Sequence, residues 1–364
     1  MTRRSVPDWV TELVRVDVRA TAGYHVADAD GLVKLDAMEN PFALPPALRA
    51  DLAQRLAAVE LNRYPDPQAQ ALTWRLRQAF GVDPRWRILL GNGSDEIIQI
   101  LIAALATPEH GVLAPAPTFV MFRLIAQWLR VPFHEVSLAA DFSLDMPAML
   151  EAVRVHRPRV VFLACPNNPT GNIFAHAALC TLIESCEALV VIDEAYLPFA
   201  SRDHADLLVR YPNVVVMRTL SKLGLAGLRL GMLFGDPAWI GELDKLRLPY
   251  NIGTLNQVAA GVVLEHYEVL REQTAMLLDE RSRLFSVLAS DPRLEVWPSE
   301  ANFLLIRLRD ADARATHERM RRRGVLVKCL DGSHPLLAGC LRVTIGSAAE
   351  NARMTQVLDA ALED

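Results

Sequence analysis

The middle of the chain alternates short apolar runs with longer amphipathic ones. The apolar runs are rich in Val, Ile or Leu and bounded by Gly, Pro, Asn or Asp, which is typical of fully buried parallel strands. They cover residues 87–90, 111–114, 160–164, 189–192, 213–218 and 232–234. Helical patterns lie between them, for example at 95–106, 118–129 and 176–186. This alternation predicts an α/β domain of three layers with a mostly parallel sheet.

The last hundred or so residues follow a different pattern. A long helical pattern runs from 255 to about 288, with strand-like runs after it at 301–308, 325–328 and 341–345 and helical ones at 313–323 and 348–362. This order predicts a smaller α+β domain, joined to the first through continuous helix. We therefore expect an N-terminal arm with part of the small domain (1–35), a large domain (36–260) and a small C-terminal domain (261–364).

Composition and charge exclude several classes of protein. The chain has 364 residues, of which 51% are hydrophobic, and this excludes disordered and fibrous proteins. Its 38 basic and 43 acidic residues are spread along the chain, which argues against nucleic-acid binding. The longest apolar stretch is half of a membrane span, no signal peptide is recognisable, and five scattered cysteines form no CxxC pair. We expect a cytoplasmic protein with reduced thiols, and without membrane, nucleic-acid or metal binding.

A glycine-rich turn follows the first strand predicted for the large domain. Residues 91–96 read GNGSDE and open the next helical pattern. Glycines permit a tight turn, Ser94 or Asp95 can cap the helix, and the free N–H groups at a helix start bind anions, most often phosphate. An ordinary strand–helix turn is the other interpretation. Because position 96 is Glu and the chain has no Gly-Lys pair, the turn is neither a dinucleotide fingerprint nor a P-loop.

Polar side chains also follow two of the buried strands. Residues 166–171, PNNPTG, place two amide side chains between prolines directly after the strand at 160–164. A rigid loop is the alternative there. Asp193 directly follows the run at 189–192, where a buried carboxylate is costly unless it meets a protonated ring nitrogen, an arginine or a metal. A structural ion pair is the alternative for Asp193.

One lysine stands in an unusual setting. Only four of the 38 basic residues are lysines, namely Lys34, Lys222, Lys245 and Lys328, and the other 34 are arginines. Among the four, Lys222 alone lies in an apolar, glycine-rich loop after a predicted strand, at 219–231 (TLSKLGLAGLRLG). Loss of water around an amine lowers its pKa and makes it a usable nucleophile for a carbonyl. An exposed lysine in a salt bridge is the alternative.

Together these motifs provide a phosphate site, a carboxylate for a pyridine nitrogen, Asn and Tyr donors for a phenolic oxygen, and a lysine for an aldehyde, which are the groups that hold pyridoxal 5′-phosphate. Over nearly its whole length the sequence resembles the histidinol-phosphate aminotransferases, a family of fold-type-I pyridoxal phosphate enzymes. The general aminotransferase motifs are PNNPTG (166–171), IDEAY (192–196) and SKLGLAGLRLG (221–231). The more specific motifs are AMENP (37–41), LNRYPDP (61–67), GNGSDEII (91–98), LPYNI (248–252), ANFLLIR (301–307) and CLRVTIG (340–346).

The resemblance implies that the large domain binds the cofactor, and it assigns a role to each matching residue. Lys222 would bond to the cofactor and move the proton between the substrate Cα and the cofactor. Asp193 would keep the pyridine nitrogen protonated, and Asn168 and Tyr196 would bind the ring oxygen. The phosphate ligands would be Ser94, Asp95, Thr219, Ser221, Arg229 and, from a neighbouring subunit, Tyr64. The residues facing the substrate would be Tyr24, Asn40, Lys328 and Arg342.

Three features depart from the family pattern. Phe119 stands where the family usually stacks a Tyr on the cofactor ring, so the stacking surface is kept and the hydroxyl is lost. Lys328 replaces a second arginine for the substrate's anion, and it offers a point charge instead of a fork. The interval from Lys222 to Arg229 is one residue shorter than the commonest form. The first two departures leave room for a different amine donor.

The function implied by the resemblance is an aminotransferase of histidine biosynthesis. It would interconvert L-histidinol phosphate and 2-oxoglutarate with 3-(imidazol-4-yl)-2-oxopropyl phosphate and L-glutamate, as a homodimer with shared active sites. An aromatic amino-acid aminotransferase or a phospho-amino-acid decarboxylase of the same fold are the alternatives. A ligand-sensing regulator is disfavoured because the sequence has no helix-turn-helix or basic extension, and a dehydrogenase because the dinucleotide fingerprint is missing.

Overall fold

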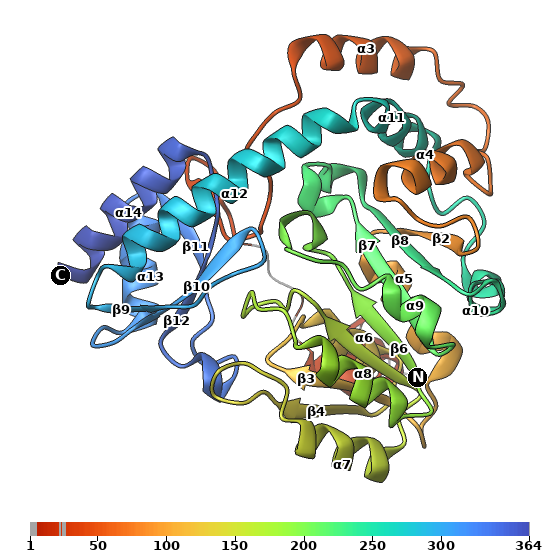
Figure 1. Cartoon of the computed structure of the whole chain (residues 1–364), viewed down its shortest axis with the longest axis horizontal. Coiled ribbons are helices and arrows are strands. Elements are labelled where there is room, and N and C mark those ends of the chain that lie inside the picture. The colour runs from red at the N-terminus through yellow and green to blue at the C-terminus, as the bar shows by residue number, and fades with distance from the viewer. Residues whose placement is uncertain (1–5, 22, 24–26, 364) are drawn as a thin grey trace. The chain divides into compact units, whose positions relative to one another are not determined.

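The computed structural model describes residues 6–21, 23 and 27–363, in two compact units that divide after Gly31 (Figure 1). The first unit contains two short helices, α1 (Val6–Leu13) and α2 (Val16–Ala20). The second unit contains two sheets and every predicted site residue except Tyr24, which lies outside the described residues. No helix of the described part is long and apolar enough to cross a membrane.

The larger sheet has seven strands in the order β2-β8-β7-β6-β5-β3-β4. Strand β8 is antiparallel to both of its neighbours, and the other six strands are parallel, which confirms the predicted mostly parallel sheet. The strands are β2 (Arg87–Asn92), β3 (Val112–Ala116), β4 (Phe133–Ser137), β5 (Val160–Ala164), β6 (Leu189–Asp193), β7 (Val214–Thr219) and β8 (Leu230–Gly235). The sequence analysis missed β4, an edge strand whose exposed polar residues leave no apolar run.

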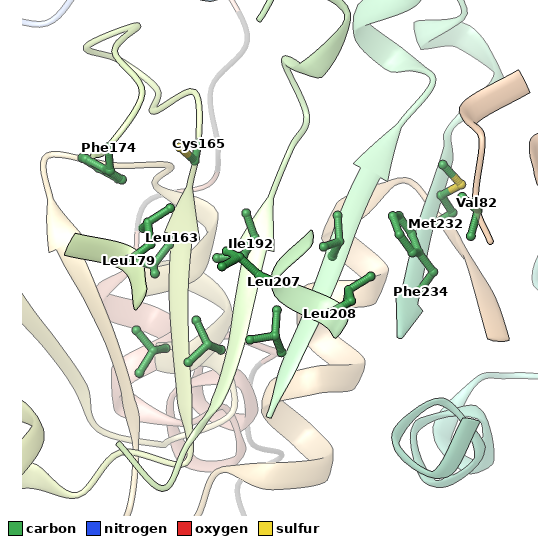
Figure 2. Packing of buried hydrophobic residues seen from close by; sticks show 14 of the residues in the cluster. Val82, Leu163, Cys165, Phe174, Leu179, Ile192, Leu207, Leu208, Met232 and Phe234 are labelled. Carbon is green, nitrogen blue, oxygen red and sulfur yellow. The ribbon is translucent and has the colours of Figure 1, made fainter. Parts of the chain in front are cut away.

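Side chains alternate along the strands and divide the core into two clusters. Along β5, Val161 and Leu163 belong to one cluster, and Val160 and Phe162 belong to the other. The first cluster includes residues of α4, α7, α8, α9 and α11 and is partly drawn in Figure 2, whereas the second includes residues of α5, α6 and α10. Helices therefore cover both faces of the sheet and make the three predicted layers.

The helices of this part of the chain are α3 (Pro46–Ala57), α4 (Gln70–Phe80), α5 (Ser94–Leu105), α6 (Met121–Trp128), α7 (Met146–His156), α8 (His176–Glu184), α9 (Asp206–Arg210), α10 (Pro237–Leu243) and α11 (Thr254–Glu265). Short 3₁₀ helices lie at Leu197–Phe199, Ser221–Leu223, Ala226–Leu228 and Asp244–Leu246, and another follows at Pro335–Leu337. The turn at Ser221–Leu223 carries Lys222, so the predicted nucleophile stands on a short ordered element.

The smaller sheet has the order β1-β11-β12-β10-β9, and only β1 pairs in parallel. Its strands are β1 (Val33–Leu35), β9 (Leu294–Val296), β10 (Phe303–Leu308), β11 (Val325–Cys329) and β12 (Cys340–Thr344). The helices α12 (Tyr267–Ala289), α13 (Ala313–Arg322) and α14 (Ala348–Glu363) pack against it through one apolar cluster. The domain boundaries at 36 and 260 stay predictions.

One predicted element was wrong in its continuity. The helical pattern from 255 to 288 forms two helices, α11 and α12, separated at His266. His266 has φ −117° and ψ 44°, outside the helical region, and its N–H bonds to the carbonyl of Val263. A one-residue break leaves the apolar periodicity on both sides intact, so the pattern could not reveal it.

Candidate active site

One pocket collects the polar residues that follow strands of the larger sheet. The carboxyl ends of parallel strands lie at the same edge, so the loops after β2, β3, β5, β6 and β7 converge there. The pocket has an empty volume of about 570 Å³. It is lined by Met38, Ser94, Asp95, Phe119, Ala164, Pro166, Asn168, Asp193, Ala195, Tyr196, Thr219, Ser221, Lys222 and Arg229. Every predicted cofactor-binding residue except Tyr64 therefore lies in one place.

Lys222 is one of the residues that line this pocket. Its Nζ donates to the carbonyl of Ala37 at 3.3 Å and lies 5.7 Å from the centre of the Tyr196 ring. Burial of the amine, with the positive charge of Arg342 nearby, lowers the pKa of Lys222 to about 8. A substantial fraction of the amine is therefore neutral near physiological pH, which suits a nucleophile better than a salt bridge.

Asp193 ends β6 inside the pocket and is only 4% exposed. Its Oδ1 accepts a hydrogen bond from the backbone N–H of Ala195 at 3.0 Å. Burial raises the pKa of Asp193 to about 7, and the charges of Asp95 and Glu194 contribute to this increase. The surrounding protein gives this carboxylate only a weak positive partner, so a cation placed against it would be bound favourably.

The loop after β5 sends one of its two amides into the pocket. Asn168 Nδ2 donates to the Tyr196 hydroxyl at 3.2 Å, and burial raises the pKa of Tyr196, so the phenol stays protonated and able to donate. Asn167 instead holds the loop, because its Nδ2 donates to the carbonyl of Pro117 and to the Thr170 hydroxyl at 3.0 and 2.7 Å. The rigid-loop interpretation applies to Asn167, whereas Asn168 lines the pocket.

An anion cradle lies at the start of α5. A Cβ atom at Gly93 would come within 2.6 Å of the Arg229 guanidinium, and one at Gly231 within 2.7 Å of the Ser94 backbone nitrogen. Gly93 also has a φ of 78°, which favours glycine. Side chains at these two positions would collide with Arg229 and with the backbone of Ser94, so the glycines let the N–H groups at the start of α5 and the Arg229 guanidinium lie close together.

These residues fit pyridoxal 5′-phosphate. The cradle suits its phosphate, and Asp193 is a buried carboxylate without a strong cation partner, as a protonated pyridine nitrogen requires. Lys222 is a partly neutral amine for its aldehyde, and Phe119 offers an aromatic face, held edge-on against Phe122. The donor set therefore agrees with the group at each of its functional ends.

Four of the predicted residues that the structure describes lie outside the pocket lining, namely Tyr64, Asn40, Lys328 and Arg342. Tyr64 is 81% exposed and stacks on Tyr250 with ring centres 4.5 Å apart. Asn40 packs against the loop that carries Lys222, and its Nδ2 donates to the carbonyl of Leu223 and to Gln273.

The two predicted substrate cations are neighbours on the smaller sheet. Lys328 and Arg342 are opposite each other in the β11–β12 register, so their side chains extend from the same face. Arg342 is buried and donates to Asn168 Oδ1 and to the carbonyl of Asp36. Through Asn168 it adjoins the pocket, whereas Lys328 is exposed beside it.

The sequence analysis missed two features of the site. Met38 lines the pocket with a φ of 55°, but an apolar residue in a loop offers no chemical signal. The other is an ion pair between Glu194, which is next to Asp193, and Arg218. Glu194 accepts a hydrogen bond of 2.8 Å from Arg218, and neither residue lines the pocket. The structural ion pair considered for Asp193 is thus formed by its neighbour. An acidic residue after a strand and an arginine in the next strand are too common to predict such a pair.

Comparisons with known proteins agree with this geometry. The family model for aminotransferase class I and II matches residues 30–360. Histidinol-phosphate aminotransferase 2 of Cupriavidus pinatubonensis is 49% identical over 98% of this chain and 99% of its own. Histidinol-phosphate aminotransferase 1 of Ralstonia nicotianae is 49% identical over 99% and 97%. A crystal structure of the Sinorhizobium meliloti histidinol-phosphate aminotransferase in complex with pyridoxal 5′-phosphate has the same fold, with TM-score 0.85, 24% identity, and 96% and 98% coverage.

Proposed function

The chain belongs to the class I and II aminotransferases, and we propose that it exchanges the amino group between L-histidinol phosphate and 2-oxoglutarate. The products are 3-(imidazol-4-yl)-2-oxopropyl phosphate and L-glutamate, and the pathway is histidine biosynthesis. The observation that carries this substrate is 49% identity with two histidinol-phosphate aminotransferases along nearly the full length of both chains. The cofactor is pyridoxal 5′-phosphate, whose functional ends the pocket matches.

The bound cofactor supplies an aldehyde that captures the substrate amine and a protonated ring that withdraws the electron pair left at Cα. Lys222 takes the proton from the substrate Cα and transfers it to the cofactor, a role that its pKa of about 8 suits. Asp193 holds its charge against the ring nitrogen. Tyr196 and Asn168 orient the ring through its oxygen, while Ser94 and its neighbours in the cradle hold the phosphate.

Arg342 and Lys328 bind the anionic end of both substrates in turn. Histidinol phosphate has no α-carboxylate and carries a phosphate, whereas glutamate carries two carboxylates. A guanidinium fork suits phosphate and carboxylate alike, and the lysine adds charge without fixing a direction. Support comes from the position of Arg342, buried beside Asn168 at the pocket, with Lys328 directly across the strand pair.

The working assembly is a cytoplasmic homodimer in which Tyr64 reaches the cofactor phosphate of the neighbouring subunit. Tyr64 is highly exposed on its own subunit, and two large apolar side chains near it in sequence or space, Leu61 and Leu248, are 73% and 70% exposed. Apolar side chains exposed together favour a protein interface. Each site would then be completed by the other chain.

A panel of amines with 2-oxoglutarate tests the proposal. The purified holoenzyme is mixed with each amine, and conversion of the bound cofactor to its pyridoxamine form is followed by absorbance. Histidinol phosphate should convert it fastest, L-glutamate should convert it in the same direction, and 2-oxoglutarate should return the pyridoxamine form to the aldehyde form. A clear preference for aromatic amino acids would replace the proposed substrate, and release of carbon dioxide from a phospho-amino acid would replace the reaction.

A further inference from the structure

Behind the pocket lies a group of buried polar side chains that the reaction above does not use. This buried cluster consists of Glu194, His204, Arg218 and Cys165, which are between 1% and 3% exposed. Glu194 Oε1 accepts from the His204 backbone N–H at 2.6 Å and lies 3.2 Å from His204 Nδ1. Glu194 Oε2 accepts from Arg218 Nε at 2.8 Å, and His204 Nε2 lies 3.7 Å from the Cys165 sulfur.

The buried cluster is tied to the backbone that carries Asp193. Cys165 donates its backbone N–H to the Asp193 carbonyl at 2.9 Å, and Glu194 donates its own to Met217 at 2.8 Å. Met217 is followed directly by Arg218. Cys165 is thus linked to Asp193 by a backbone hydrogen bond, and Glu194 is its neighbour in sequence. Arg218 is linked less directly, through Met217. His204 is the member that comes from elsewhere, just before α9.

The charge of Glu194 also acts on Asp193, because it contributes to the raised pKa of Asp193. Burial alone would raise the pKa of Glu194, but hydrogen bonds and charge from His204 and Arg218 outweigh it and lower this pKa. Burial would lower the pKa of His204, yet its contacts with Cys165 and Glu194 raise it to about 10. Other ionisable groups near the cluster are Asp203, 3.7 Å from Arg218, His176, with its ring centre 6.3 Å from that of His204, and Tyr267, on which the charge of Arg218 acts.

We propose that His204 is a positioning residue for the transamination, acting through Glu194. It fixes the end of β6, and as an imidazolium it compensates the charge of Glu194, so that the Asp193 carboxylate keeps its place and its charge for the cofactor ring. This role rests on the proposed function. A buried carboxylate next to Asp193 would otherwise oppose ionisation of Asp193, because like charges in a desolvated site raise each other's pKa.

A rescue experiment separates this role from simple stability. The holoenzyme variants are His204→Gln, Glu194→Gln and the double variant, and His317→Gln is the matched control, since His317 also makes a hydrogen bond inside the protein but on α13. Three quantities are measured for each: the thermal midpoint, the affinity of apo-protein for pyridoxal 5′-phosphate, and the midpoint of the pH titration of the cofactor's absorption band.

His204→Gln should weaken cofactor affinity about threefold to tenfold and raise the titration midpoint by about half a pH unit, because loss of the positive charge of the imidazolium favours protonated forms nearby. Glu194→Gln should lower the midpoint. The double variant should return both quantities toward wild type, since one positive and one negative charge are removed together and the net charge of the cluster is restored.

Two results would overturn the role of His204. One is a His204→Gln variant with a lower thermal midpoint but unchanged titration and cofactor affinity, which would make the buried cluster structural only. The other is no rescue in the double variant. If His204→Gln does not fold, an unchanged titration midpoint in Glu194→Gln contradicts the proposal equally. Failure of the wild-type protein to bind the cofactor would instead refute the proposed function.

Discussion

Asp193 and Glu194 are consecutive buried carboxylates with opposite surroundings. Asp193 turns into the pocket, where its carboxylate meets one backbone N–H and its pKa rises to about 7. Glu194 turns away and meets Arg218 and His204, which lower its pKa despite complete burial. The same contrast separates the two nearby cations, since Lys222 loses part of its charge in the pocket while Arg218 is paired.

The difference separates a reactive site from a structural one. A buried ion with its partner in place contributes to the fold, and removing the partner is costly. A buried ion without a partner costs free energy until a ligand provides one, so its shifted pKa marks a functional position. Substitutions of Asp193 and Lys222 in the pocket should therefore act most strongly on turnover, and substitution of Glu194 should act most strongly on stability.

The largest effect is expected on the pocket side, for Lys222→Ala. Loss of the amine should reduce turnover by about four orders of magnitude or more, because both capture of the cofactor aldehyde and transfer of the Cα proton depend on it. Folding should be preserved, since a costly buried amine is removed. Steady-state rates and a thermal melt measure the two effects.

Lys245→Ala is the matched control, because Lys245 is an exposed lysine paired with Glu242. Borohydride reduction of the wild-type holoenzyme should attach the cofactor to Lys222. Attachment to Lys34, Lys245 or Lys328 would contradict the assignment.

On the other side of β6, Glu194→Ala should act on stability. It leaves Arg218 and His204 without their acceptor in a buried place, which costs about 3–5 kcal/mol of unfolding free energy. Urea unfolding measures this loss. Glu242→Ala removes an exposed salt bridge instead and should cost less than about 1 kcal/mol. Equal losses for the two variants would show that the buried pair of Glu194 contributes no more to stability than an exposed salt bridge does.

Asp193→Asn should separate stability from activity in a single variant. The pKa of Asp193 in the folded protein, about 7, lies above the ordinary 3.8. The stability that this protonated carboxyl contributes is therefore fully present below about pH 4 and is lost as the pH rises through 7. Up to about 4 kcal/mol of apo-protein stability should disappear over this window in the wild type and not in the variant.

The variant should also turn over slowly, because an amide cannot balance the charge of a protonated ring nitrogen. Urea unfolding of the apo-proteins at about pH 5 and about pH 8 tests the stability effect. Parallel pH profiles for wild type and variant, or a normal rate, would show that Asp193 is not the unpaired carboxylate of this comparison.

Much of the fold could be predicted because its strands are continuous apolar runs bounded by turn residues, as at 160–164 and 189–192. β4 and the three-residue strands β1 and β9 could not, because edge position and shortness remove the apolar run. The break at His266 was hidden for the reason that periodicity continues across it. The local pattern of apolar residues therefore predicts buried elements well, but it does not predict short interruptions of a helix.

The pocket could be predicted because parallel topology brings the strand ends together, so residues distant in sequence, such as Ser94 and Lys222, were assigned to one site. The pairing at the end of β6 could not. Nothing in IDEAY distinguishes which carboxylate finds a partner, because Arg218 and His204 reach Glu194 only in the folded chain. Which buried charge is left unpaired is a tertiary property.

Arg342 is a buried charge that has both a structural contact and a contact at the pocket. It donates to the carbonyl of Asp36, as a structural arginine would, and to Asn168 at the pocket. If it binds the substrate anion, Arg342→Ala should cost about 2–4 kcal/mol of transition-state stabilisation in both half-reactions, and Arg342→Lys should restore only part because a fork becomes a single contact.

Single-turnover rates with histidinol phosphate and with glutamate measure the two half-reactions separately. Arg307→Ala is the matched control, because Arg307 lies on the same sheet and pairs with Glu295. Equal losses in both half-reactions, without a similar loss in the control, would place Arg342 with the pocket. Normal rates combined with reduced stability would place it with Glu194 and Arg218, as a charge whose partner is the protein itself.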